Sequence, residues 1–135
     1  MAPHIVGGVL TDSRGVLMAH RRPDRENAPD TWSFAGGHVD PGETPVEALR
    51  RELHEELGVA AVVEGEPHLN VVEGGAGAEP VVFSMWIVRQ WTGVPVNAAP
   101  DEHDELRWVR SADLDGLVLA HTFCRTLVEE LSGSA

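Results

Sequence analysis

A short helix with clearly marked ends constrains this chain more than any other feature of its sequence. Thr44 offers a hydroxyl for an N-cap, Pro45 suits the first helical position, and Glu47 follows at the spacing of a capping box. Gly58 supplies the C-terminal stop. The sequence therefore predicts a helix over residues 45–57.

This helix carries two different faces. Apolar side chains at helical spacing predict a stripe toward the core, made by Val46, Leu49, Leu53 and Leu57. Beside that stripe lie three carboxylates, those of Glu52, Glu55 and Glu56. Like charges three or four residues apart cost about 0.2–0.5 kcal/mol per pair, and the end of a helix already favours cations. The acidic face is therefore costly for an isolated helix and well suited to a divalent cation.

Oxygen ligands without cysteine indicate a hard ion, Mg²⁺ or Mn²⁺. The alternative is a solvated acidic surface, because charge runs on helices are usually exposed to water. Arg51 is placed four residues after Glu47 and four before Glu55, so it can pair with either.

The spacing of the surrounding residues favours the metal interpretation. The chain resembles the Nudix hydrolase family, because it matches the family's box without a mismatch at Gly37, Glu43, Arg51, Glu52, Leu53, Glu55, Glu56, Gly58 and Val59. The resemblance implies an α/β fold of the Nudix α/β/α sandwich type. In it, a mixed central sheet lies between the box helix and a C-terminal helix.

The resemblance also implies the roles of the box residues. The three glutamates of the acidic face are expected to bind the metal, together with the carbonyl of Gly36 and the carboxylate of Glu102. Glu43 and Arg51 are expected to brace the loop and orient the ligands. The expected catalytic set is Glu52, Glu55, Glu102 and Arg51.

Beyond the box, the chain is similar to the antimutator (MutT-like) nucleoside-triphosphate hydrolases. That similarity implies a phosphate-contacting arginine at Arg22, with Arg21 as the competing choice, and an aromatic residue near the base at Phe34. Trp32 is expected either to stack on a base or to pack at a strand edge. Glu102 is either the family's distal acidic residue or a solvated loop carboxylate.

The chain departs from that subgroup at two positions, and the second of them affects the expected substrate. Ala35 replaces a proline before the paired glycines, and Val118 lies near the position of an asparagine that reads an oxidised purine. Specificity for oxidised guanine is therefore not expected. Most histidines are expected to be structural, since Mg²⁺ disfavours imidazole, and His103 beside Glu102 is the one exception to watch.

Composition narrows the function further. The chain has 135 residues and a formal charge of −12, so we expect one domain over 1–135 and no nucleic-acid polymer as partner. The single Cys124 is expected to be a buried, unreactive thiol. Without an apolar run of membrane length or a signal peptide, we expect a cytoplasmic protein with no membrane partner. A homodimer is compatible with the sequence.

Short apolar runs and turn residues predict the remaining elements. Strands are expected over His4–Leu10 and Val16–Ala19, paired as a hairpin, and over Val59–Val63, His68–Val72, Val81–Gln90 and Glu105–Val109. Loops are expected over Arg21–Thr31, Glu73–Pro80 and Pro95–His103. Val81–Gln90 is expected to be the longest strand and central, a helix is expected to start at Ser111, and a closing helix is expected over Leu117–Leu131.

The acidic helix face and the resemblance to the Nudix family together predict Mg²⁺-dependent hydrolysis of a nucleoside di- or triphosphate. A triphosphate is expected to be cut to the monophosphate and pyrophosphate. ADP-ribose or a nucleotide sugar is the alternative substrate. A nucleotide-sensing module without turnover is less favoured, because such modules tend to lose box carboxylates and this chain keeps them all.

Overall fold

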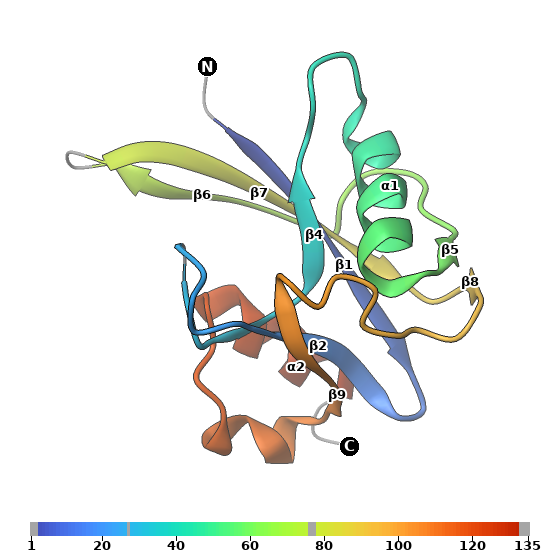
Figure 1. Cartoon of the computed structure of the whole chain (residues 1–135), viewed down its shortest axis with the longest axis vertical. Coiled ribbons are helices and arrows are strands. Elements are labelled where there is room, and N and C mark those ends of the chain that lie inside the picture. The colour runs from blue at the N-terminus through green and yellow to red at the C-terminus, as the bar shows by residue number, and fades with distance from the viewer. Residues whose placement is uncertain (1–2, 27, 76–77, 133–135) are drawn as a thin grey trace.

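A computed structural model describes residues 3–26, 28–75 and 78–132 of the chain. Within these residues, seven strands form one mixed sheet (Figure 1). The strands of this sheet are β1 (His4–Asp12), β2 (Gly15–Arg21), β3 (Trp32–Ser33), β4 (Ala35–His38), β6 (Leu69–Gly75), β7 (Ala78–Val88) and β9 (His103–Val109). The order is β3-β2-β1-β7-β6, while β4 also pairs with β1 and β9 with β2.

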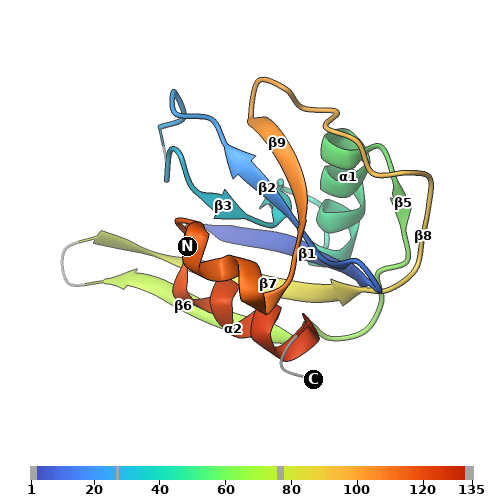
Figure 2. The same cartoon turned by 90° about the horizontal axis from the view of Figure 1, so that it is seen from below.

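Helices cover both faces of this sheet. Figure 2 shows α1 (Pro45–Leu57) on one side and α2 (Thr122–Ser132) on the other, with β1 and β7 between them. Each helix packs on its own buried cluster, one containing Leu49, Leu53 and Leu57, the other Leu127 and Val128. The expected α/β/α sandwich with a mixed central sheet is confirmed.

The ends of α1 lie where the sequence predicts them. The Thr44 hydroxyl accepts the backbone N–H of Glu47 at 3.2 Å, and the Glu47 carboxylate accepts the N–H of Thr44 at 2.8 Å. Gly58 adopts the left-handed conformation, with φ of 71°, and its N–H donates to the carbonyl of His54. These contacts fix the start and end of the helix that carries the acidic face.

The predicted N-terminal hairpin is correct only at its turn. β1 and β2 pair at Thr11–Val16 and Asp12–Gly15. Beyond those pairs, β1 runs parallel to β7 and antiparallel to β4, whereas β2 leaves to pair with β9 and β3. β1 therefore holds the central place that the sequence assigned to β7. As predicted, β7 is the longest strand.

The loop predicted over Glu73–Pro80 is largely wrong. β6 continues to Gly75 and β7 begins at Ala78, so most of the predicted loop is strand. The rest of that stretch, residues 76–77, lies outside the described residues. The glycines are accommodated because the ladder has a bulge there, where Gly74 has φ of 99°. The strand predicted over Val59–Val63 shrinks to β5 (Ala60–Ala61), which pairs with β8 (Trp91–Thr92).

The closing helix begins later than predicted. A 3₁₀ helix, η1, spans Ser111–Gly116, and the residues from 117 to 121 are not helical. The backbone of Trp32 explains this. Its backbone N–H donates to the carbonyl of Val118, and its carbonyl accepts the backbone N–H of Ala120. These bonds to β3 replace the first turn of the predicted helix. Among the described residues, no helix is long and apolar enough to cross a membrane.

Removing the Thr44 hydroxyl tests the capping box. We expect Thr44→Ala to lower the free energy of unfolding by about 1 kcal/mol, because the N–H of Glu47 loses its partner. Urea denaturation followed by circular dichroism measures this change. Thr92→Ala, at an exposed threonine outside the helices, is the control, and an equal loss in both variants would contradict the capping role.

Candidate metal centre and active site

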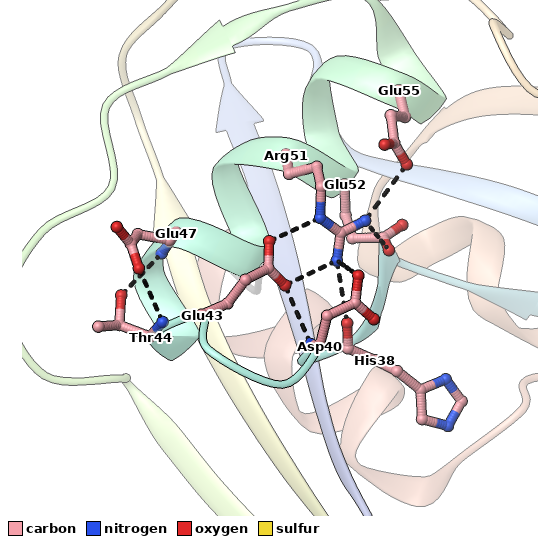
Figure 3. A network of polar contacts seen from close by, with 8 residues as sticks. All are labelled: His38, Asp40, Glu43, Thr44, Glu47, Arg51, Glu52 and Glu55. Atoms are coloured by element: carbon pink, nitrogen blue, oxygen red, sulfur yellow. Dashed lines mark hydrogen bonds and ion pairs between the residues drawn. The ribbon is translucent and has the colours of Figure 1, made fainter.

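Arg51 is the centre of a polar network at the base of the site. Its guanidinium donates to both carboxylate oxygens of Glu43, at 2.7 and 2.9 Å, and to Glu52 at 2.8 Å (Figure 3). It also donates to Glu55 at 3.3 Å and to the carbonyl of His38 at 3.2 Å. Arg51 thus ties the loop before α1 to the acidic face of the helix.

This network has clear electrostatic consequences. The hydrogen bonds from Arg51 lower the pKa of Glu43 to about 2, and hydrogen bonding to Glu43 raises the pKa of Arg51 above its ordinary value. The predicted pairing of Arg51 with Glu55 is present, whereas Glu47 serves the capping box instead. Both Arg51 and Glu43 stay charged at neutral pH and hold the neighbouring carboxylates in place.

Glycines bring the backbone of β4 close to the acidic face. A Cβ on Gly37 would lie 2.6 Å from the Glu52 carboxyl carbon. A Cβ on Gly36 would lie 2.0 Å from the carbonyl oxygen of Val6 on β1. Only glycine therefore permits the close packing of β1, β4 and α1 at this point.

Glu56 is the most unusual group of the site. It is 2% exposed, and its Oε2 atom has no hydrogen-bond partner among the described residues. Burial raises its pKa to about 10, the nearby Glu52 and Glu102 carboxylates act in the same direction, and the backbone N–H of Gly36 opposes them. A buried carboxylate of this kind needs a proton or a cation.

Glu102 reaches this position because its loop is fastened to the end of α1. The N–H groups of Val96 and Ala98 donate to the carbonyls of Leu57 and Glu56, at 3.0 and 2.9 Å. Ligand atoms of Glu56, Glu102 and His103 consequently lie within 4.8 Å of one another. The structure thus places the distal acidic residue of the sequence prediction beside the box helix.

The arginines around this cluster differ from the expectation. Arg22 is partly exposed, pairs with Asp24 at 3.0 Å and donates to the carbonyl of Pro100, and no contact with a carboxylate of the acidic face is seen among the described residues. Arg21 is nearer, since burial and the positive charge of Arg25 lower its pKa while Glu102 and Glu56 oppose this effect. Arg25 lies 3.7 Å from Glu102. Arg21 was the competing choice, and Arg25 was missed because nothing in its loop marks it in the sequence.

The two expected base-contacting aromatic residues are buried on the other face of the sheet. Trp32 and Phe34 both belong to the cluster beneath α2. The Trp32 ring contacts His20 and lies under the guanidinium of Arg107, whose Cζ is 4.7 Å from the ring centroid. Trp32 therefore packs at the edge of the sheet, the second of its two expected roles, while the side chain of Val118 is largely exposed.

Two further expectations concern Cys124, which lies on the buried face of α2, and His103, which lies beside Glu56. Cys124 is fully buried, and burial raises the pKa of its thiol to about 11, as expected for an unreactive thiol. His103 is 5% exposed, and burial, with the charges of Arg21 and Arg25, lowers its pKa to about 4. Its imidazole is therefore neutral at physiological pH.

The arrangement of carboxylates fits a divalent cation. The carboxylates of Glu52 and Glu102 lie near that of Glu56, whose Oε2 atom has no hydrogen-bond partner among the described residues, and oxygen is the donor that Mg²⁺ and Mn²⁺ prefer. Glu55 adds a more exposed carboxylate on the same helix. The site could therefore hold a divalent cation, whose positive charge would favour an anionic substrate.

Comparison with known proteins supports the same conclusion. The model of the NUDIX domain family matches residues 1–129. This chain belongs to the Nudix family. It is 30% identical to the 8-oxo-dGTP diphosphatase of Haemophilus influenzae, over 82% of this chain and 78% of that protein. It is 41% identical to the CTP pyrophosphohydrolase of Escherichia coli, over 77% and 73%.

Solved structures show the same fold. The MutT NUDIX hydrolase from Burkholderia pseudomallei superposes with a TM-score of 0.80 and 25% identity, covering 97% of this chain and 98% of that one. The E. coli ORF135 protein gives 0.75 and 29%, covering 95% and 86%. The chain is therefore a Nudix hydrolase of the MutT-like type.

The raised pKa of Glu56 predicts how pH affects the metal-free protein. Between the ordinary pKa of a carboxyl group and about 10, the folded state holds a proton that the unfolded state has lost, so stability falls as pH rises. Glu56→Gln removes this loss. Relative to wild type, we expect its free energy of unfolding to increase from about pH 5 to about pH 9, by at most about 1.4 kcal/mol per pH unit, with a corresponding gain in melting temperature.

Thermal melting in chelator measures this effect in the metal-free protein. Melting with Mg²⁺ and without chelator is the comparison. Glu64→Gln, at an exposed glutamate, controls for the loss of one charge. If the difference between Glu56→Gln and wild type were the same at every pH, Glu56 would not hold a proton in the folded protein.

Proposed function

We propose that this Nudix hydrolase is a Mg²⁺-dependent pyrophosphohydrolase that cuts a nucleoside triphosphate to the monophosphate and pyrophosphate. The observation that supports this most is the buried Glu56 carboxylate, which faces Glu52 and Glu102 and has an oxygen without a partner. Three convergent carboxylates provide enough negative charge for more than one divalent cation. A polyphosphate carries several negative charges, so it matches a site with more than one cation better than a single phosphate ester does.

The proposed roles follow the positions of the side chains. Glu52, Glu55, Glu56 and Glu102 hold the cation, with the backbone of Gly36 against Glu56. A bound divalent cation stabilises the negative charge that develops on the phosphoryl oxygens. Arg51 and Glu43 keep the helix carboxylates oriented. Arg21 and Arg25 are the cations nearest to the cluster for a phosphate chain, in place of Arg22.

The names of the relatives agree with this substrate class. The similar proteins include a CTP pyrophosphohydrolase, an 8-oxo-dGTP diphosphatase and an RNA pyrophosphohydrolase. Each of these acts on a phosphate chain attached to a nucleoside. We extend to this chain only that shared chemistry, with a small nucleotide as the substrate. Recognition of oxidised guanine is not included, because Val118 lies near the position of the asparagine that reads the oxidised purine.

The products of the reaction test the proposal. We expect a panel of nucleoside triphosphates with Mg²⁺ to yield monophosphate and pyrophosphate, separated by ion-exchange chromatography. Glu56→Gln should lower turnover by orders of magnitude, because it removes a ligand charge while the metal-free fold is retained. Release of orthophosphate alone, or turnover confined to ADP-ribose and sugar nucleotides, would overturn the proposed substrate and leave the Nudix chemistry intact.

Two neighbouring acids in one loop provide a matched comparison. We expect Glu102→Gln to reduce kcat by at least about tenfold and Asp101→Asn to have little effect. The reason is that Glu102 joins the cluster with Glu56, whereas Asp101 is exposed. Steady-state assays at limiting Mg²⁺ measure both variants. Equal, small effects would mean that Glu102 is a solvated loop carboxylate without a role in turnover.

A further inference from the structure

His103 lies where a metal ligand would be expected, although the Nudix box has no place for it. Its Nε2 atom is 3.5 Å from Oε1 of Glu56, and its ligand atom lies within 4.8 Å of those of Glu56 and Glu102. Adjacent ligands of an octahedral ion with bonds of about 2.1 Å are about 3 Å apart, and opposite ones about 4.2 Å. The 3.5 Å between His103 and Glu56 falls between these two values, and the Glu102 carboxylate lies close to both, so the three side chains are near enough to share one ion after small adjustments.

The burial of this cluster separates it from an ordinary acidic surface. His103 and Glu56 are both more than nine-tenths buried. In each of them one polar atom, Nδ1 of His103 and Oε2 of Glu56, has no hydrogen-bond partner among the described residues. Unpartnered polar atoms are costly in a protein interior. A cation bound at Glu56 would compensate the charge of this buried carboxylate, whose Oε1 atom faces His103.

The backbone holds His103 in this position. His20 pairs with Glu105 and Arg21 with His103, so Asp104 is an extra residue in β9 that turns His103 toward α1. The N–H of His103 donates to the carbonyl of Ala99, and its carbonyl accepts the side-chain amide of Asn97 at 2.6 Å. The ring is thus presented by a fastened bulge and not by a free loop.

We propose that His103 is a nitrogen ligand of a divalent metal held with Glu56 and Glu102, and that this ligand makes the site prefer Mn²⁺ over Mg²⁺. Imidazole nitrogen favours first-row transition metals, whereas Mg²⁺ binds oxygen almost exclusively. The inference rests on the proposed function, because it assigns Glu56 and Glu102 to the metal. It adds the nitrogen donor and the metal preference that follows from it.

Pulsed electron paramagnetic resonance of the wild-type protein with Mn²⁺ tests this directly. We expect nuclear modulation from a directly bound ¹⁴N of imidazole, which should disappear in His103→Asn and persist in His54→Asn. His54 is the matched control because it is exposed on α1. Modulation that is absent from the wild type, or retained in His103→Asn, would overturn the proposal. The wild-type measurement does not depend on whether any variant folds.

Calorimetric titration provides the second readout. His103→Asn should weaken Mn²⁺ binding by about tenfold or more, and Mg²⁺ binding by less than about threefold. Equal losses for both ions would show a role in positioning alone and overturn the nitrogen ligand. Glu56→Gln separates the two proposals. If it abolishes Mn²⁺ binding while the wild type lacks a ¹⁴N signal, the metal site of the proposed function stands and the ligand role of His103 fails.

Discussion

The contact between the Arg51 guanidinium and its carboxylates is the interaction on which the site depends. Without it, the loop before α1 and the acidic face of that helix would repel each other. The bonds to Glu43 and Glu52 matter most, because these carboxylates are mostly buried and Glu43 is held by two parallel hydrogen bonds. The pairs with Asp40 and Glu55 involve half-exposed side chains and contribute much less.

One guanidinium cannot neutralise every carboxylate of this face. Arg51 holds the outer carboxylates, while Glu56 is buried and has one oxygen without a hydrogen-bond partner in the described part of the chain. The glycines of β4 leave no side chain of their own between β1 and the carboxylates. The fold thus concentrates an unbalanced negative charge in one buried place, and a divalent cation balances that charge better than another side chain would.

The sequence predicted the parts of the protein whose signals are local. The capping box, Gly58 and the apolar stripe specify where α1 begins, ends and packs. Once the helix is located, the position of its acidic face is determined. The errors occur where distant segments decide the outcome. Residues 117–121 are apolar enough for a helix, but the backbone of Trp32 binds them in an extended form. For Trp32 the sequence left two roles open, because the strand β2 and the Arg107 guanidinium that cover it are not its neighbours in the chain.

The same reasoning explains the choice of arginine at the site. Arg21 and Arg22 are neighbours in sequence but differ in their surroundings: Arg22 pairs with Asp24, while Arg21 lies at the bulge opposite His103. In a protein of charge −12, an anionic substrate is repelled everywhere except near such local cations. Arg21 and Arg25 stand on one side of the carboxylate cluster. A phosphate chain of the proposed substrate would be attracted to these two cations and to a metal held by the carboxylates.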